Sequence, residues 1–402
     1  MCKGRPLQRA AIVMLETPPA GSRSGITAGT LTQRIKAMGT ALGFDLVGVS
    51  PVQPPAHGES LAEWLRRGYH GEMAYMTRTA GKRMHPGELL PWARSVVSVA
   101  LNYNTPYTRE AEAEGIRGWI SRYAWGDDYH DVMQAKLERL LDSVREVAGP
   151  KVQGRVYVDA GPVMDRETGV RAGIGWFGKN TNLLSMKVGS FFFLGELFLN
   201  LELEYDRPIR DRCGQCRLCL DACPTNAFVG PYVLDARKCI SYLTIELKGP
   251  IPRELRPLMG THIFGCDICQ DVCPYNTKVK PTKEQAFHPR AGSHAPELIP
   301  LLSLTEAEFK ARFAGSPVLR AKRRGFLRNV CVALGNLKRP EAVPALARTL
   351  REDPEPLVRA HAAWALGQTR TPGAEAALHD ARSRESDPTV LPEIESALGG
   401  LT

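Results

Sequence analysis

The sequence lacks any apolar run long enough to cross a membrane. A membrane-spanning helix needs about 20 mainly apolar residues, whereas the longest candidate, 191–199, is short and contains Glu196. The N-terminal region also lacks a recognisable export signal, because the apolar stretch 10–15 is soon followed by Glu16 and Pro18. We therefore expect a cytoplasmic protein with no membrane partner.

Hydrophobic periodicity is missing from the first 30 residues. These residues are rich in Gly, Pro, Ser, Thr and Arg, a composition that buries too little apolar surface to fold by itself. We expect 1–30 to form a disordered extension, with a start codon placed too far upstream as the alternative, and the fold to begin near Thr30. The whole chain of 402 residues is 43% apolar and 24% charged, as in globular proteins with two or three domains.

A disulfide framework is not expected, although the chain contains ten cysteines. Disulfides are rare in the reducing cytoplasm, so these cysteines need another use. Cys2 lies in the predicted extension, and Cys331 lies in an apolar helical stripe, where we expect a small buried side chain. The other eight fall between residues 213 and 273.

Helical and strand patterns alternate in the first half of the chain. Periodic apolar residues predict helices at 31–42 and 129–147, and buried apolar runs predict strands at 44–49 and 93–101. This alternation is typical of an α/β fold. We expect an α/β catalytic domain at 31–208.

The cysteines form two runs. The first has the spacing of bacterial-type ferredoxins, with thiolates three residues apart and a last cysteine before proline: Cys213-x2-Cys216-x2-Cys219-x3-Cys223-Pro224. The second run is Cys266-x2-Cys269-x3-Cys273-Pro274. It lacks its first cysteine, because Ile263 stands there, and Cys239 is the natural substitute. We expect a ferredoxin-like domain at 209–283.

In two-cluster ferredoxins the cysteine before proline binds the other cluster. Crossing the runs in this way uses all eight cysteines, four for each of two [4Fe–4S] clusters. One predicted set is Cys213, Cys216, Cys219 and Cys273, and the other is Cys223, Cys239, Cys266 and Cys269. Zinc is the alternative, because Cys-x2-Cys pairs also suit tetrahedral sites; the extra Cys-Pro that ends each run favours iron–sulfur clusters.

The last third of the chain contains an internal repeat. The triplet Ala-Leu-Gly begins at Ala333, Ala365 and Ala397, at a spacing of 32 residues. Repeats of this length with helix-favouring residues are typical of HEAT-like helical solenoids, in which each helix pair covers its neighbour. We expect such a domain at 284–402; an irregular helical bundle is the alternative.

Positive charge concentrates near the start of these repeats. Residues 276–360 hold 16 Lys and Arg against 8 Asp and Glu, a balance of +8, and the whole chain has a net charge of +9. A basic stretch of this kind favours a polyanionic partner. A solvated surface is the alternative. Lys322, Arg323 and Arg324 are the candidate phosphate contacts.

A carboxylate and a glycine-rich loop precede the cysteines. Asp159 follows a predicted strand and comes before a Gly-Pro turn, where it can act as an acid in a cleft or cap the turn. The loop 173–178 reads Gly-Ile-Gly-Trp-Phe-Gly. It follows a helical stretch instead of a strand, which argues against a dinucleotide fingerprint and favours close approach of the backbone to a large ligand.

Several long motifs together resemble the epoxyqueuosine reductase family, whose members complete queuosine in tRNA with the help of cobalamin. The resemblance covers the chain from about residue 31 to the repeats and rests on Asp159-Ala-Gly-Pro, on the cysteine runs, and on the stretches 121–130, 171–180, 239–246 and 265–274.

The resemblance implies a cobalamin-binding α/β domain like that of reductive dehalogenases, without a lower axial ligand from an Asp-x-His-x-x-Gly motif, which this sequence lacks. It implies reduction of epoxyqueuosine to queuosine at the wobble position of the tRNA anticodon, with Asp159 as the proton donor and the two clusters as the electron path. The implied cobalamin contacts are Arg83, Arg122, Asp159, Leu183, Leu194, Ser241, Cys266 and Asp267.

The implied partners are the tRNA anticodon stem-loop and a low-potential electron donor such as ferredoxin or flavodoxin, with the enzyme as a monomer. Two alternatives stay open at this point. One is a reductive-dehalogenase-like corrinoid enzyme that acts on a small molecule, and the other is a non-catalytic electron carrier with an RNA-binding appendage.

Overall fold

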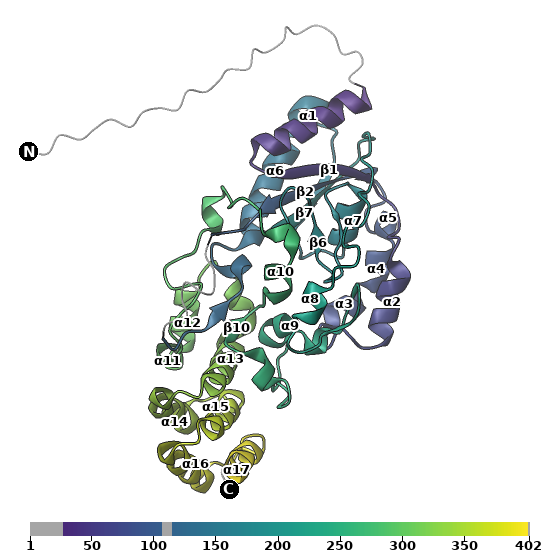
Figure 1. Cartoon of the computed structure of the whole chain (residues 1–402). Coiled ribbons are helices and arrows are strands. Elements are labelled where there is room, and N and C mark those ends of the chain that lie inside the picture. Colours follow the sequence, from purple (N-terminus) through teal and green to yellow (C-terminus); the bar gives the residue numbers. More distant parts are fainter. Residues whose placement is uncertain (1–26, 107–114, 401–402) are drawn as a thin grey trace, which may run out of the picture.

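The computed structural model describes residues 27–106 and 115–400, and Figure 1 shows their arrangement. The first helix, α1 (Ala28–Ala41), begins after Thr27, whose side chain caps it by accepting a hydrogen bond from the Thr30 amide. The fold therefore starts slightly before the predicted position, and 28–30 are helical. The rest of the predicted extension, including Cys2, lies outside the described residues.

A four-stranded sheet forms the centre of the first half, in the order β1-β2-β7-β4. All three pairings are antiparallel. The central strands are the most apolar segments, because each is covered on both faces. The strands are β1 (Leu46–Pro51), β2 (Ser95–Asn102), β7 (Phe192–Leu199) and β4 (Gly154–Tyr157).

Helices cover both faces of this sheet. Val97, Val99 and Leu101 of β2 pack with α1 and with α6 (Tyr129–Ala148) on one face. On the other face α7 (Asp165–Arg171) contacts β1, β2 and β7. At Gly48 this approach is so close that a Cβ atom would lie 2.0 Å from the Ala172 carbonyl oxygen. Short helices flank the sheet, namely α2 (Gly58–Arg66), α3 (Ala74–Arg78), α4 (Ala80–Met84) and α5 (Pro86–Leu89).

The cysteine-rich segment is built from short elements. Helices α8 (Leu218–Asp221) and α10 (Ile268–Asp271) lie within the two cysteine runs and contact each other. Strand β10 (His262–Phe264) pairs in parallel with β3 (Trp119–Ile120), which ties the second run to the first domain. The remaining short elements are β5 (Trp176–Phe177), β6 (Leu183–Leu184), β8 (Phe228–Gly230), β9 (Val233–Leu234) and α9 (Ile240–Ile245).

The C-terminal helices stack as a solenoid below the sheet domain in Figure 1. The repeated Ala-Leu-Gly triplet explains the stacking. A Cβ atom at Gly335 would lie 2.9 Å from the Ala365 Cα, and one at Gly367 would lie 2.7 Å from the Ala397 Cβ. The glycines thus let successive helices pack closely. These helices are α11 (Leu298–Leu301), α12 (Glu306–Arg312), α13 (Lys322–Leu337), α14 (Val343–Glu352), α15 (Pro356–Thr369), α16 (Pro372–Arg384) and α17 (Leu391–Gly399).

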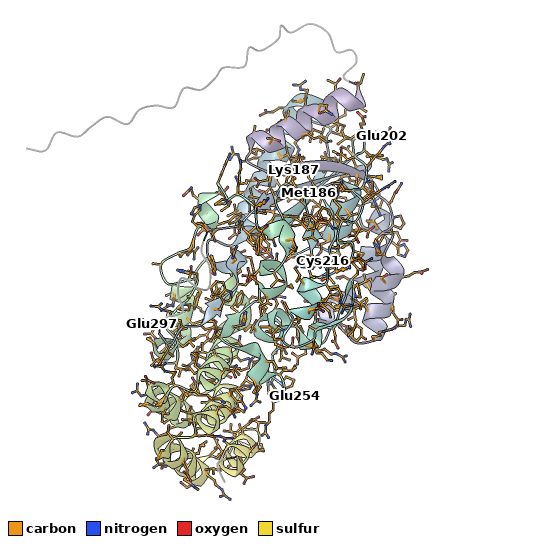
Figure 2. The ribbon with its side chains drawn as sticks, in the orientation of Figure 1. Met186, Lys187, Glu202, Cys216, Glu254 and Glu297 are labelled. Atoms are coloured by element: carbon orange, nitrogen blue, oxygen red, sulfur yellow. The ribbon has the colours of Figure 1, made fainter. Side chains whose placement is uncertain are left out.

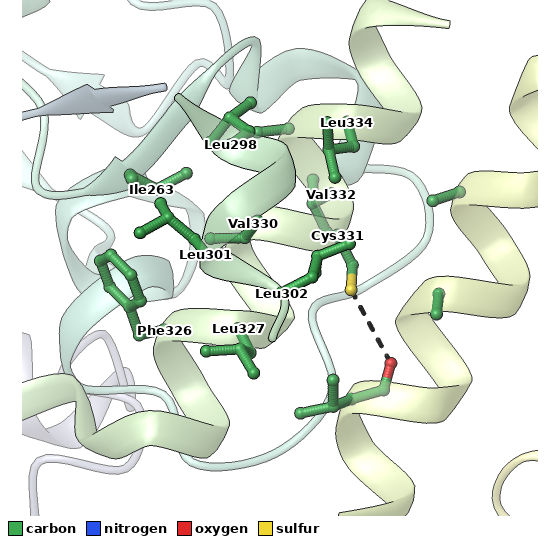
Figure 3. Close-up of a cluster of buried hydrophobic side chains, with 14 of the residues drawn as sticks. Ile263, Leu298, Leu301, Leu302, Phe326, Leu327, Val330, Cys331, Val332 and Leu334 are labelled. Carbon is green, nitrogen blue, oxygen red and sulfur yellow. Dashed lines mark hydrogen bonds between the residues drawn. The ribbon is translucent and has the colours of Figure 1, made fainter. Parts of the chain in front are cut away.

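One hydrophobic core joins the repeats to the cysteine-rich segment. It runs from Trp119 and Phe264 through α13 to Ile394. Figure 3 shows part of it, with Cys331 among Leu, Val and Ile side chains. Cys331 is fully buried, as its apolar stripe predicts. Within the described ranges no helix is long and apolar enough to cross a membrane.

Candidate functional site

Four of the eight cysteines approach one another at the surface, and we call Cys213, Cys216, Cys219 and Cys273 the outer set. Cys216 is exposed and Cys273 is buried. Burial and the charges of the other three members raise the pKa of Cys219 to about 11. The Cys213 and Cys216 charges also raise the pKa of Cys273, after burial. The charges of these thiols therefore act on one another, and the crossed ligation of a cluster stays a prediction, because no group of three such side chains among the described residues is already arranged to hold a metal ion.

The remaining four lie deeper, and we call Cys223, Cys239, Cys266 and Cys269 the inner set. Burial raises the pKa of Cys269 well above its ordinary value, and the charges of Cys266 and Cys239 add to this. Burial also raises the pKa of Cys239, which is close enough to Cys223 to feel its charge.

Both sets fit iron–sulfur clusters better than free thiols. Raised thiol pKa values mean that thiolates are unfavourable in these places without a cation. Iron supplies the positive charge that stabilises coordinating thiolates. Each set provides the four thiolates that a [4Fe–4S] cluster requires.

A large cavity of about 2230 Å³ lies between the sheet domain, the inner set and the start of the repeats. Ligand sites usually measure about 300–1,000 Å³, so this cavity has room for a large cofactor together with part of a substrate. Cys239 of the inner set lines it, whereas none of the outer-set thiols does. The cavity therefore communicates with one cysteine set only.

Asp159 lies at the cavity wall, two residues after the end of β4. Its φ of 51° is a left-handed backbone conformation that turns the chain toward the Gly161-Pro162 turn. The side chain is exposed to the cavity and accepts a hydrogen bond of 2.5 Å from the Tyr129 hydroxyl. No backbone amide of the described residues donates to it, so a turn-capping role does not account for Asp159.

Three tyrosines surround this carboxyl group. Burial, followed by the Asp159 charge, raises the pKa of Tyr123 and of Tyr129 well above the ordinary value. Burial and the charge of Glu246 raise the pKa of Tyr75 to about 12, with a smaller contribution from Asp159. All three hydroxyls therefore stay protonated and can donate hydrogen bonds near Asp159.

Further titratable groups lie around Asp159. Burial raises the pKa of Glu196 well above its ordinary value, and the charge of Asp165 adds to this. A neutral Glu196 avoids another negative charge next to Asp159 and Asp165. His130 lies on the cavity wall. Burial opposes its charged form, but the hydrogen bond and charge of Asp128 outweigh this and raise the pKa of His130.

The predicted cobalamin contacts divide into two groups. Arg83, Asp159 and Ser241 line the cavity. Of the predicted contacts within the described ranges, the other five, Arg122, Leu183, Leu194, Cys266 and Asp267, are not part of its lining.

Arg122 and Asp267 are engaged with the protein. The Asp267 carboxylate accepts hydrogen bonds from the Ser121 hydroxyl and, at 2.7 Å, from the Arg122 amide. The Arg122 guanidinium donates to Asn104 Oδ1 at 2.6 Å and lies 4.4 Å from the centre of the Phe191 ring. These contacts fasten the second cysteine run to the sheet domain.

The basic triplet at the start of α13 is not uniformly available for phosphates. Lys322 and Arg324 are exposed. Arg323 is buried and pairs with Asp353 at 2.6 Å, so the expectation that it contacts phosphate is wrong. Arg320, on the cavity wall, pairs with Glu246 at 3.0 Å.

Sequence reasoning missed part of the site. Tyr129 was inside the motif 121–130, but nothing in its spacing assigned it to Asp159. Tyr75 and the cavity-lining pair His57 and Glu167, whose side chains are 2.6 Å apart, carried no motif. The one sequence feature that could have pointed to a site residue here was the position of Tyr129 at the start of a strongly periodic helix.

Three families match parts of the chain. Residues 83–160 match a family described as "Epoxyqueuosine reductase QueG, DUF1730". Residues 212–276 match "4Fe-4S double cluster binding domain", and residues 318–399 match "HEAT repeats". The second match favours iron–sulfur clusters over zinc, and the third favours a solenoid over an irregular bundle.

Relatives match over most of the chain. An epoxyqueuosine reductase of Pseudomonas aeruginosa is 45% identical over 358 residues, which are 88% of this chain and 98% of that protein. An epoxyqueuosine reductase of Escherichia coli K12 is 42% identical over 341 residues, covering 84% of this chain and 89% of that protein.

Solved structures of epoxyqueuosine reductases have the same fold. One, crystallised with an epoxyqueuosine-modified stem loop of tyrosine tRNA, is 33% identical with a TM-score of 0.87 and covers 93% of this chain and 100% of its own. Another, from Streptococcus thermophilus, is 32% identical with a TM-score of 0.80 and covers 91% of this chain and 98% of its own.

Proposed function

The chain belongs to the epoxyqueuosine reductase family, and from this premise we propose that it reduces epoxyqueuosine in tRNA to queuosine with cobalamin bound in the large cavity. The reaction consumes two electrons and two protons, opens the epoxide, and yields an alkene and water. The observation that carries the proposal is that Asp159, Cys239 and Ser241 line one cavity large enough for cofactor and substrate.

Two kinds of cofactor fit the residues present. We propose that the outer set and the inner set each hold one [4Fe–4S] cluster through their four thiolates. Arg83 and Ser241, which line the cavity, are the proposed side-chain contacts of cobalamin. When bound, these groups supply single electrons and a low-potential cobalt centre for opening the epoxide. The other predicted contacts, Arg122, Leu183, Leu194, Cys266 and Asp267, do not line the cavity and are not part of this proposal.

A side chain of the protein supplies the proton for the epoxide oxygen. Expulsion of an alkoxide is unfavourable unless its oxygen is protonated, so an acid must lie beside the epoxide. We propose that Asp159 donates this proton. Tyr129 orients the carboxyl group through its hydrogen bond to Asp159 Oδ2. Tyr75 and Tyr123 stay protonated and complete the polar wall around it.

The proposed route of the tRNA substrate to the cavity starts at exposed basic side chains. Lys322 and Arg324 are exposed at the start of the repeats, and Arg320, two residues earlier than Lys322, lines the cavity. We propose that these residues lie near phosphates of the anticodon stem-loop while the modified base enters the cavity. The relative crystallised with a tRNA stem loop supports this partner.

The test is the substitution Asp159→Asn in the cofactor-loaded enzyme. Asparagine keeps the size and polarity of the side chain but cannot donate an acidic proton. We expect turnover of an epoxyqueuosine-containing stem-loop to fall by a factor of about 100 or more, while cobalamin uptake and stem-loop affinity stay within about twofold. Tyr129→Phe removes only the orienting hydrogen bond and should cost about tenfold in turnover.

The readouts are queuosine formation by nucleoside analysis, the visible spectrum for cobalamin uptake, and stem-loop binding. Turnover by the Asp159→Asn enzyme at the unsubstituted rate would remove Asp159 from the chemistry. Failure of the unsubstituted enzyme to take up cobalamin would instead refute the cofactor assignment.

A further inference from the structure

The surface at the outer set carries exposed apolar side chains that the proposed reaction does not use. Leu218, next to Cys219, is 52% exposed, and Met186 is 60% exposed. Single exposed apolar residues are ordinary. These two, however, lie on segments that are joined through Tyr275, so we assign them to one surface with the exposed Cys216.

The contacts between these segments place them together. Met186 is in the turn closed by Ser185 and Gly189, and a Cβ atom at Gly189 would lie 3.0 Å from the Tyr275 carbonyl oxygen. The Tyr275 hydroxyl in turn donates to the Arg212 carbonyl at 2.7 Å. The turn, the end of the second cysteine run and the start of the first run thus form a continuous surface. In Figure 2, Met186 and Lys187 lie above Cys216.

This surface is positively charged. The segments 185–189, 207–221 and 271–280 carry seven Lys and Arg against three Asp, a balance of +4. Of the cations, Lys187, Arg217 and five others are exposed. Asp221 is compensated by Arg217 at 3.4 Å. This pair neutralises one of the seven cations, and the excess of positive charge over the three segments remains.

We propose that this surface, the donor face, docks a small acidic electron-transfer protein. We define it by Cys216, Leu218, Met186 and the surrounding cations Lys187, Arg212, Arg217 and Lys278. The inference rests on the proposed function, because it supplies the electrons that the reaction consumes. An apolar centre lets the two redox groups approach without water between them, and a basic rim steers an acidic partner into place.

The electron balance of the step is simple. The donor protein is the reductant and loses one electron, and the outer cluster gains it; no bond, proton or leaving group moves. Two such events supply one turnover.

The position of the donor face separates it from the substrate. No outer-set thiol among the described residues lines the cavity, whereas Cys239 of the inner set does. A donor at the outer set therefore leaves the cavity open to tRNA. A nucleic acid on the donor face would use the cations alone, and it would leave Leu218 and Met186 without a role.

The test uses the double variant Lys187→Glu/Arg217→Glu in the cofactor-loaded enzyme. Both side chains are exposed, so their substitution should not disturb folding. The matched control is Arg34→Glu/Lys151→Glu, which makes the same change in net charge at exposed positions of the sheet domain. The probe is a purified flavodoxin, an acidic protein that carries flavin mononucleotide.

We expect the double variant to weaken flavodoxin binding, measured by calorimetry at low salt, by about tenfold or more. Turnover driven by reduced flavodoxin should fall by a similar factor at limiting flavodoxin. Turnover driven by dithionite, iron content and stem-loop affinity should not change. The control variant should bind flavodoxin within about twofold of the unsubstituted enzyme.

Two results would overturn the donor face. One is equal flavodoxin affinity for the double variant and the control. The other is loss of stem-loop affinity in the double variant, which would assign the surface to RNA. Absence of dithionite-driven turnover in the unsubstituted enzyme is a different failure, because it refutes the proposed function and not the docking of the donor.

Discussion

The two cysteine sets have similar spacing but opposite surroundings. In the outer set Cys216 is exposed, and Cys273 is backed only by a small apolar cluster with Trp176 and Leu184. In the inner set Cys239 lines the cavity and packs, with Cys266, against the large core that continues into the repeats. We infer that electrons arrive from solution at the outer set and leave from the inner set at the cavity.

The difference also concerns how the two sets are supported. The outer loop is held by the Lys179 ammonium, which donates to the carbonyls of Gly214 at 2.6 Å and Cys216 at 2.9 Å. The segment after Cys239 is held by Arg328, which is fully buried and donates to the carbonyls of Leu243, Leu247 and Gly249. The repeats are thus a scaffold for the inner set as well as a basic surface.

The largest expected effect comes from removing one ligand of each set. Cys239→Ser should abolish turnover with any reductant, because the inner set lies between the donor and the cavity. Cys216→Ser should abolish turnover driven by flavodoxin but retain at least about a tenth of that driven by dithionite, which can diffuse into the cavity. Each variant should lose about half of the iron, because each set holds one of two clusters.

Iron analysis, visible spectroscopy and turnover with both reductants measure these effects. The control is Cys331→Ala, which removes a cysteine buried in the repeats and should leave the iron content unchanged. If the two ligand variants lost turnover equally with both reductants, the two sets would be equivalent and the inferred direction would be wrong.

A smaller effect is expected from replacing Arg328 or Lys179, the two side chains that hold the segments around the cysteine sets. Arg328→Met relieves the burial of a charged group, since burial lowers the pKa of Arg328 to about 9. It also removes the donor to one buried and two part-buried carbonyls, at about 1–3 kcal/mol for a buried group left unsatisfied and less for the other two. We expect a net loss of about 3 kcal/mol in the free energy of unfolding. Lys179→Met, at the outer loop, should cost at most about 1 kcal/mol, because water can replace the ammonium.

Denaturant unfolding of both variants, each with intact clusters, measures the difference. Loss of iron from the Arg328→Met protein should accompany its unfolding and should affect the inner cluster first. Equal destabilisation by the two substitutions would contradict the view that the support of the inner set by Arg328 is the stronger of the two.

Much of this comparison could be predicted from local sequence. Cysteine spacing predicts two sets, and in the structure the charges of these thiols act on one another; the division into sets and the ligation of clusters stay predictions. The Ala-Leu-Gly triplet predicts the stacked helices, because a glycine is needed wherever the helix of one repeat packs closely on the helix of the next. The cysteine spacing and the repeat can be read from the sequence because each depends on residues that are a fixed number of positions apart along the chain.

Other features depend on contacts between residues that are far apart in the sequence, which no local pattern identifies. Arg323 belongs to a Lys-Arg-Arg triplet that looks uniformly basic, yet it pairs with Asp353 because α13 packs on the following repeat. The antiparallel sheet has the same helix and strand periodicity as a parallel one, so alternation alone did not distinguish them. Tyr129 reaches Asp159 only because α6 lies across the sheet. Each of these contacts is set by tertiary packing.

The smallest expected effect concerns pH and tests how the repeats hold the segment that follows the inner set. His361 in α15 is fully buried; its Nε2 accepts from the Ile251 amide at 3.2 Å, and its Nδ1 lies 2.7 Å from the Leu357 carbonyl oxygen. Burial, with the charges of Arg256 and Arg328, lowers the pKa of His361 well below its ordinary value. The ring is therefore neutral in the folded protein and positively charged in the unfolded chain below about pH 6.5.

Because the unfolded chain binds the additional proton, the stability that His361 contributes is fully present above about pH 6.5 and is lost as the pH falls toward the folded pKa. The slope is at most about 1.4 kcal/mol per pH unit. Comparison of urea unfolding between pH 7 and pH 5.5 should show a shallower slope for His361→Gln than for the unsubstituted protein. His379→Gln, at an exposed position of α16, is the control and should leave the slope unchanged. Identical slopes in all three proteins would mean that protonation does not loosen the contact between α15 and the segment at Ile251, and that this support of the inner set is insensitive to pH.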